Sequence, residues 1–293
     1  MTVDELQNLG RSYQRAVLQS DAAASLFAVD EALRRGAQAV DVYSSLLIPA
    51  QVNVGILWKN GGLSVAQEHL ATQLALRALE RVRSALPRRR ALGARAIVAG
   101  VEGDPHEMGA RMFADLLHLD GWDVDFLGAD LPAKDLVDFS LQRSPRIVAL
   151  SLTMREHANS LRRTLKALRA AGSRVPVLAG GAGVMWLKPS DHGPGLTILG
   201  DLAQALHAAR ALARPQDPAE VIAEYLSALG GRIHAMRGER GLSQQELATR
   251  AGLDRTYISA VENGKQNVSL ATVGRIAHAL EVPLSELLVE TGP

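Results

Sequence analysis

The sequence contains no cysteine, which removes several kinds of chemistry at once. Disulfide bonds, thiolate metal ligands and cysteine nucleophiles are all excluded, and this composition suits a protein kept in a reducing compartment. We find no N-terminal basic segment followed by an apolar one, and no apolar run close to the ~20 residues that a membrane span requires. We therefore expect a cytoplasmic protein.

The chain also lacks an excess of charge of either sign. Its 293 residues include 32 Lys and Arg against 31 Asp and Glu, a formal net charge of +1. The molecule as a whole therefore has no general attraction for nucleic acid, and any DNA binding must come from a local surface. The length allows two or three domains, and a hydrophobic content of 47% is that of a globular protein.

Hydrophobic spacing divides the chain into three segments. Residues 1–86 have apolar positions at helical spacing and predict an all-α bundle, in which Gly36, Pro49 and Gly61-Gly62 separate four or five helices. Residues 91–213 alternate strands and helices, which favours an α/β, flavodoxin-like parallel sheet. The strands are predicted at 94–101, 123–127, 146–152, 175–179 and 196–199. After a linker at 214–218 the pattern is helical again.

Polar residues and glycines follow three of these strands. The loop after the first strand contains Asp104 and His106, and an aspartate there can hold one ring nitrogen of the histidine and leave the other to bind a metal. Ser151 ends another strand, and Gly180-Gly181 end the next. Ligands bind beyond the carboxyl ends of parallel strands, so we expect all of these residues on one rim.

The spacing resembles that of cobalamin-binding domains. Asp104, His106 and Gly109 match an Asp-x-His-x-x-Gly signature, 41 residues separate Gly109 from Ser151, and 26 separate Thr153 from the glycine pair. The resemblance implies that His106 is the lower cobalt ligand and that Ser151 bonds the nucleotide base of the lower tail, for which the glycines leave room. Thr153 stands where the family has leucine, and it also suits a half-buried strand. The alternative is an ordinary flavodoxin-like domain with a surface histidine.

The helical segment carries Trp58, with Glu68-His69 following after nine residues. This spacing resembles the cap of CarH/LitR-type photoreceptor regulators, where helices shield the adenosyl group above cobalt. The resemblance implies that Trp58 covers this group and that Glu68 and His69 line its pocket, since an adenosyl group offers a face for stacking and hydroxyls for a carboxylate. Alternatively, Trp58 is helix core and Glu68-His69 an exposed face. Lys59 stands where a cobalt-binding histidine occurs in well-known members, so the light product is not predicted.

Residues 228–293 predict an all-α helix-turn-helix domain. Ser243 and Glu246 form a capping box, Gly252 ends the first helix, and Asp254 can cap the second. The run 241–265 resembles the phage-repressor (XRE) family. The DNA contacts implied by the resemblance are Gln244 at a phosphate, Arg255, Thr256 and Ala260 at base edges, and Tyr257, Asn263 and Lys265 near the DNA backbone.

The charges of this last segment cancel, because seven Arg and Lys face seven Asp and Glu. A neutral module has little non-specific affinity for DNA, so useful affinity requires two or more copies on one operator, and we expect a homodimer or tetramer. Arg237 and Glu262 occupy positions that pair internally in the family. The alternative is a helix-turn-helix that serves only protein interaction.

Together these patterns predict a multidomain regulator with a helical cap (1–86), a cobalamin domain (91–213) and a DNA-binding domain (228–293). Its function would be adenosylcobalamin-dependent and light-responsive: photolysis of the cobalt–carbon bond would change oligomeric state and binding to an operator in double-stranded DNA. The alternatives are a cobalamin-sensing repressor that ignores light and a corrinoid methyl carrier. No catalytic nucleophile or acid–base pair is evident, so we expect a non-enzyme. The remaining residues of interest are predicted to be surface histidines (His157, His192, His207) and packing tryptophans (Trp122, Trp186).

Overall fold

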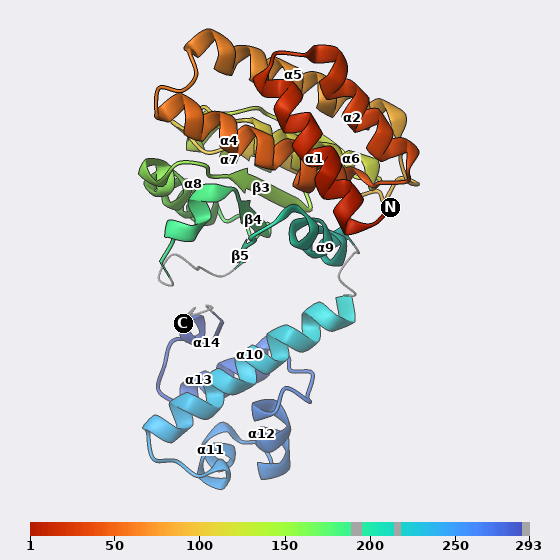
Figure 1. Cartoon of the computed structure of the whole chain (residues 1–293). Coiled ribbons are helices and arrows are strands. Elements are labelled where there is room, and N and C mark those ends of the chain that lie inside the picture. The colour runs from red at the N-terminus through yellow and green to blue at the C-terminus, as the bar shows by residue number, and fades with distance from the viewer. Residues whose placement is uncertain (189–194, 214–217, 289–293) are drawn as a thin grey trace. The chain divides into compact units, whose positions relative to one another are not determined.

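The computed structural model describes residues 1–188, 195–213 and 218–288 (Figure 1). The chain divides into two compact units, Met1–Arg214 and Pro215–Pro293. The first unit contains a helical bundle and a helix-wrapped parallel sheet, and the second is helical, so the predicted multidomain fold class is confirmed. His192 lies outside the described residues.

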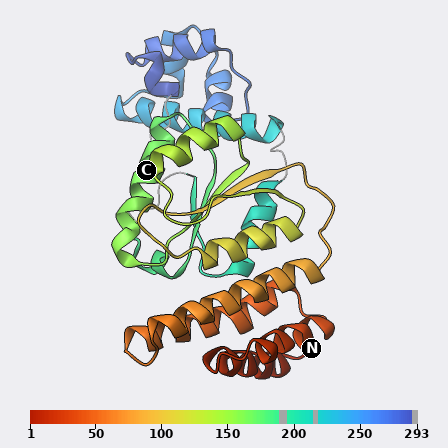
Figure 2. The ribbon, with the colours of Figure 1, turned by 90° about the horizontal axis from the view of Figure 1, so that it is seen from above.

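The bundle begins the first unit and packs against the sheet domain. Its elements are α1 (Val3–Leu18), α2 (Ala22–Arg34), α3 (Ala39–Val42), the π-helical turn η1 (Tyr43–Leu47), α4 (Ile48–Lys59) and α5 (Val65–Ala85). Figure 2 shows these helices, red to orange, along one side of the sheet domain. Met112, Leu116 and Leu119 of the first sheet-domain helix belong to the same apolar core as the bundle, so the two parts of this unit share one interior.

Pro49 does not separate two helices, contrary to the prediction. Elements α3, η1 and α4 form one helical run from Ala39 to Lys59. The π turn is wider than an α turn, and Pro49, which has no N–H to donate, directly follows it. A Cβ on Gly10 of α1 would lie 2.4 Å from the carbonyl oxygen of Ser45, so this close approach of α1 to the π turn requires glycine.

The same run, Ala39–Lys59, is long and apolar enough by length and composition to cross a membrane, with a mean hydropathy of 1.3. The expectation that no segment approaches such a length is therefore wrong. Polar residues such as Ser44 and Asn53 interrupt the apolar run in the sequence without lowering its average below this level. In this structure Leu46, Leu47 and other residues of the run form part of the bundle core.

The sheet is parallel, as predicted, with strand order β2-β1-β3-β4-β5. Its strands are β1 (Arg95–Gly100), β2 (Asp123–Phe126), β3 (Ile147–Ser151), β4 (Val177–Gly180) and β5 (Leu196–Ile198). The intervening helices are α6 (Met108–Leu119), α7 (Ala133–Arg143), α8 (Ala158–Ala170) and α9 (Leu202–Ala213), with short 3-10 turns η2 (Arg155–His157) and η3 (Ala182–Trp186). The strand order reverses between β1 and β3, which is where such sheets bind ligands.

The second unit consists of α10 (Pro218–Glu239), α11 (Gln244–Ala251), α12 (Arg255–Glu262), α13 (Leu270–Ala279) and α14 (Leu284–Leu288). Ser243 and Glu246 form the predicted capping box, and Gly252 ends α11 in the left-handed conformation with φ 64°. Asp254 occupies the capping position of α12, but its side chain accepts no capping hydrogen bond from the described residues, so that part of the prediction is wrong. Leu247, Ile258 and Ile276 form the centre of the core.

Candidate functional site

The loop between β1 and α6 presents His106 on a buried aspartate. The Nδ1 atom of His106 lies 2.7 Å from Oδ1 of Asp104, whose side chain is fully buried, whereas the His106 side chain is 49% exposed. Hydrogen bonding to the carboxylate places the proton on Nδ1 and leaves the lone pair of Nε2 available. The histidine can therefore act as a single axial metal ligand.

Backbone groups from the neighbouring strand hold Asp104 in place. Its Oδ2 accepts hydrogen bonds from the N–H groups of Thr153 (2.6 Å) and Met154 (3.1 Å), and its Oδ1 accepts one from the N–H of His106 (3.2 Å). Burial alone would raise the pKa of Asp104, but these bonds and the imidazole outweigh it and lower the pKa. The pKa of His106 is raised, chiefly by its bond to Asp104. The pair thus joins the β1 loop to the end of β3.

The other predicted lower-face residues meet at the same edge. Ser151 is directly paired with Gly180 in the sheet, and a Cβ on Gly109 would lie 3.6 Å from Oγ of Ser151. Gly181 has φ 99°, and a Cβ there would lie 2.4 Å from the Leu152 carbonyl oxygen, so the chain can turn here only with glycine. The structure therefore brings together the pieces that the sequence separates by more than forty residues.

The cap residues lie at the junction of α4 and α5. Trp58, near the end of α4, is 49% exposed, which contradicts the alternative that it is helix core. Glu68, on the first turn of α5, contributes by its charge to the raised pKa of His106, so it lies within electrostatic reach of that ring. His69 is exposed, and its Nε2 lies 3.6 Å from Oε2 of Glu68. This end of the bundle carries polar and aromatic groups that its core does not use.

The structure corrects two expectations and adds one residue that the sequence analysis did not name. The charge of Glu156, next to His157 on η2, also raises the pKa of His106. His157 is half-buried rather than on the surface, since a Cβ on Gly103 would lie 2.9 Å from its Nδ1. Trp186 is exposed, contrary to the packing role predicted for it, whereas Trp122 is fully buried, as predicted. No motif marks Glu156, because only the folded sheet brings η2 to the β1 loop.

The site fits a corrinoid better than a bare metal ion. Among the described residues, no group of three or more His, Asp or Glu side chains could hold a metal. One histidine with a free Nε2 suits a metal that arrives with most of its ligands already in place. At the end of β4, a Cβ on Gly180 would have its nearest neighbour, the Leu199 carbonyl oxygen, 3.9 Å away, so this position is not crowded by the protein itself.

The second unit exposes the beginning of α12. Arg255 and Thr256 are exposed on its first turn, and Ala260, one turn later on the same face as Thr256, is half-buried. Lys265 is exposed beyond the helix. Tyr257 packs partly against the core, and the Asn263 side chain donates to the Ser259 carbonyl (2.7 Å). This surface presents the short side chains Thr256 and Ala260, with the cations Arg255 and Lys265 beside them. Such a surface can enter the major groove of DNA.

A buried carboxylate lies beneath this surface. Glu262 accepts hydrogen bonds from Arg237 (2.6 and 3.1 Å) and from Gln244 Nε2 (2.9 Å), and it lies 3.0 Å from His234 Nδ1. The predicted pairing of Arg237 with Glu262 is confirmed. Burial alone would raise the pKa of Glu262, but these partners lower it. Gln244, predicted at a DNA phosphate, uses its amide N–H within the protein and has only its amide oxygen and remaining N–H free.

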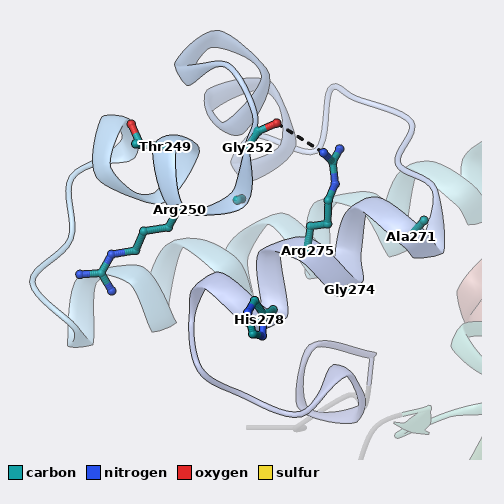
Figure 3. Close-up of a pocket in the computed structure, with 8 residues that line it drawn as sticks. Thr249, Arg250, Gly252, Ala271, Gly274, Arg275 and His278 are labelled. Atoms are coloured by element: carbon teal, nitrogen blue, oxygen red, sulfur yellow. Dashed lines mark hydrogen bonds between the residues drawn. The ribbon is translucent and has the colours of Figure 1, made fainter.

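A shallow groove of about 610 Å³ lies between α11 and α13. Figure 3 shows Arg275 of α13 reaching toward the carbonyl of Gly252, to which it donates a hydrogen bond of 3.4 Å, with Arg250 and His278 nearby. The groove lies at the carboxyl end of α11, whereas Gln244 begins that helix. It is therefore separate from the predicted DNA contacts.

Comparison with known families assigns each part of the chain. Residues 94–206 match the family described as B12 binding domain, residues 9–83 match a second family with the same description, and residues 233–287 match a helix-turn-helix family. The resemblance to CarH-type cobalamin-binding transcriptional regulators is confirmed. The chain thus combines two segments that match B12 binding families with one that matches a helix-turn-helix family.

Two curated relatives are HTH-type transcriptional repressors. The HTH-type transcriptional repressor CarA of Myxococcus xanthus is 38% identical over 121 residues, which are 41% of this chain and 42% of CarA. The HTH-type transcriptional repressor CarH of the same organism is 36% identical over 141 residues, 48% of this chain and 46% of CarH. The chain therefore spans less than half the length of either relative.

A solved structure shares the fold of the first unit. The monomethylamine corrinoid protein of Methanosarcina barkeri has a TM-score of 0.60 and 20% sequence identity, over 70% of this chain and 99% of that one. At this identity the likeness shows the fold alone, which is a parallel-sheet domain with associated helices.

Proposed function

We propose that this chain is an adenosylcobalamin-dependent, light-responsive transcriptional regulator that acts in the cytoplasm and is not an enzyme. The observation that carries the proposal is the half-exposed His106, held by buried Asp104 and within electrostatic reach of Glu68 of the cap, in a chain that also has a helix-turn-helix. Its relatives CarA and CarH are HTH-type transcriptional repressors, and two of its segments match B12 binding families. Use of the adenosyl form and of light are the finer parts of the proposal.

The sheet residues provide the lower half of the cofactor site. His106 binds cobalt through Nε2, and Asp104 fixes the ring orientation and strengthens the ligand by accepting its other N–H. Ser151 bonds the base of the lower tail, Gly109, Gly180 and Gly181 leave room for it, and Thr153 holds Asp104 through its backbone N–H. When bound, adenosylcobalamin supplies a cobalt–carbon bond that green or blue light can break.

The cap residues provide the upper half. The exposed ring of Trp58 covers the adenosyl group by stacking, Glu68 accepts hydrogen bonds from ribose hydroxyls, and His69 lines the same pocket. Loss of the adenosyl group removes these contacts, and a ligand shifts only those equilibria whose states it contacts differently. The cap is therefore the part whose arrangement depends on light.

The helix-turn-helix provides the output. Arg255, Thr256 and Ala260 read base edges of an operator in double-stranded DNA, and Gln244, Tyr257, Asn263 and Lys265 position the module on the phosphate backbone. Because the module is electrically neutral, one copy binds weakly and two or four copies bind well. A light-dependent change in the number of associated chains would thus change occupancy of the operator.

An absorption spectrum of the full chain reconstituted with adenosylcobalamin, taken before and after green light and paired with size-exclusion chromatography, tests the proposal. We expect conversion of the spectrum faster than for free cofactor, together with a change in molecular size. Photolysis at the rate of free cofactor with unchanged size would overturn the light-responsive function. Protein that stays colourless after dialysis would overturn cobalamin binding itself.

Replacement of Trp58 tests the cap assignment. Trp58→Ala should leave corrinoid bound through His106 but remove the change in size on illumination. A matched control is Phe27→Ala, because Phe27 is also an exposed aromatic residue of the bundle but lies on α2, away from the α4–α5 junction. An unchanged light response in Trp58→Ala would show that the tryptophan does not cover the upper ligand.

A corrinoid methyl carrier is the second candidate, because the matches of the bundle and the sheet domain to B12 binding families do not depend on a regulatory role. A carrier would exchange its upper ligand with a methyltransferase and has no use for a DNA-binding module. Methylation of the bound corrinoid by a partner methyltransferase would support this function. Identical DNA binding in dark and illuminated protein would instead favour a cobalamin-sensing repressor that ignores light.

A further inference from the structure

One buried carboxylate lies outside the proposed cofactor site and outside the proposed DNA contacts. It accepts hydrogen bonds from two arginines that are far apart in the sequence. The side chain of Asp120, which caps the carboxyl end of α6, is only 5% exposed. Arg210 donates to it from Nε (3.0 Å to each oxygen) and Nη2 (2.7 Å), and Arg89 donates from Nη1 (2.9 Å). Both guanidinium groups compensate this buried charge, so Asp120 links the segment after α5 to α9 at the end of α6.

The segment between the bundle and the sheet is fastened beside this carboxylate. The backbone N–H of Arg89 donates to the Leu119 carbonyl (2.8 Å), and that of Leu92 donates to the Gly121 carbonyl (3.0 Å). Gly121 has φ 101°, and a Cβ there would lie 2.3 Å from the carbonyl oxygen of Arg90. These contacts hold residues 89–92, which follow α5, against the turn that follows α6.

Three helices that begin near the cofactor site end near Asp120. Helix α5 carries Glu68 on its first turn and leads into Arg89, and α6 carries Gly109 at its beginning and ends at Asp120. Helix α9 follows β5, whose end adjoins Gly180, and it carries Arg210 on its last turn. With a rise of about 1.5 Å per residue, the twelve residues of α6 place Asp120 roughly 18 Å from the beginning of that helix.

Helix α9 also packs on both cores of the first unit. Leu202 and Leu206 contact the bundle core and the core on one face of the sheet. The chain passes from Ala213, the last residue of α9, into the second unit. A displacement of the bundle would therefore act on α9.

We propose that Asp120 is a positioning residue that couples the arrangement of the cap to α9. The inference rests on the proposed function, because it requires a cofactor that biases the cap. Coupling over such a distance needs packed elements that contact one another, and Asp120 joins the segment after α5 to α9 through its two arginines. Asp120 would touch neither cofactor nor DNA.

Hydrogen–deuterium exchange in the full chain, with and without adenosylcobalamin in the dark, tests the coupling. In the wild type we expect the cofactor to slow exchange in residues 103–109 and in residues 202–213. In Asp120→Asn, protection of 103–109 should persist, while the effect on 202–213 should fall by about fivefold or more, the lower end of ordinary coupling between sites. Asp123→Asn is the matched control, since it breaks the more exposed Arg95–Asp123 pair nearby and should keep the full effect.

Arg210→Gln gives the same test with a milder change, should Asp120→Asn fail to fold, because Arg210 is partly exposed. Rescue of the effect by Asp120→Glu would support a role of the charge. The coupling would be overturned if the cofactor slowed exchange of residues 202–213 in both Asp120→Asn and Arg210→Gln as much as in the wild type. It would also be overturned if the cofactor did not change exchange of these residues in the wild type. Failure of the wild type to bind the cofactor at all would overturn the proposed function and this inference with it.

Discussion

Asp104 in the first unit and Glu262 in the second are both buried carboxylates with a lowered pKa. Each accepts several hydrogen bonds, and each contacts a histidine, His106 and His234 respectively. They differ in the kind of group that donates to them and in whether the partner side chain keeps a free nitrogen. Asp104 is satisfied largely by backbone N–H groups and leaves His106 half-exposed with one nitrogen free, whereas Glu262 takes most of its bonds from side chains and holds Arg237 inside the domain.

The difference separates a ligand-binding site from a structural network. Burial and a shifted pKa occur in both places, so neither property alone identifies function. The distinguishing feature is a partner that keeps an unused, accessible donor or acceptor after the carboxylate is satisfied. Glu262 joins α10, α11 and α12 and stabilises their arrangement, while Asp104 orients one ring whose other nitrogen is free.

The largest expected effect is on the structural network. Glu262→Gln should destabilise the second unit by about 3–5 kcal/mol, because it leaves Arg237 without its buried counter-charge. Differential scanning calorimetry of the full chain would measure the shift of the corresponding transition. Corrinoid binding should not change. Glu286→Gln, at an exposed position of α14, is the control. An unshifted transition in Glu262→Gln would mean that the network does not stabilise the domain.

The same network should respond to acid in a defined direction. The pKa of Glu262 is lowered below 4.5 in the folded chain, so its contribution is present above the unfolded value and is lost as pH falls through the folded one. The stability difference between wild type and Glu262→Gln should therefore be full at pH 7 and shrink below about pH 4.5. Unfolding measured at several pH values checks this, and a difference that grows in acid would contradict it.

A smaller effect is expected at the cofactor site. Asp104→Asn should weaken corrinoid binding about 10–100-fold, the usual cost of removing a group that orients a metal-binding histidine. Titration followed by absorption measures the affinity. The control is Asp138→Asn on α7, which pairs with Lys134 on the surface. Affinity equal to that of the wild type would show that His106 does not need Asp104 to bind cobalt.

The smallest effect is expected where α11 begins. Ser243→Ala removes a capping bond to the N–H of Glu246 and should cost about 1 kcal/mol of stability in the second unit. Because Gln244 follows the cap and donates to Glu262, the double variant Ser243→Ala/Glu262→Gln should lose less than the sum of the single losses. Strict additivity, measured by calorimetry, would show that the cap and the network act independently.

Much of the fold could be predicted because hydrophobic periodicity and capping residues act locally. The five strands lie where the apolar runs place them, and Ser243 begins a helix as predicted. Motif spacing also predicted that His106 and Ser151 would share an edge, since parallel strands align their carboxyl ends. The roles of these residues toward a cofactor or DNA stay predictions.

Other features depend on contacts that no local pattern records. Pro49 was expected to end a helix, but the π turn before it and the close approach of Gly10 allow the helix to continue. Trp186 reads as a packing residue by its type, yet its place on η3 leaves it exposed. Asp120 belongs to no motif, because its partners Arg89 and Arg210 come from segments far apart in the sequence.

The core shared by the bundle and α6 has a consequence for engineering. Cutting the chain near residue 90 would expose Met112, Leu116 and Leu119 on one piece and the facing bundle residues on the other. The natural cassette boundary is instead near Arg214, where the first compact unit ends. Anyone wishing to place a different output under the control of this module should transplant residues 1–214 as one part.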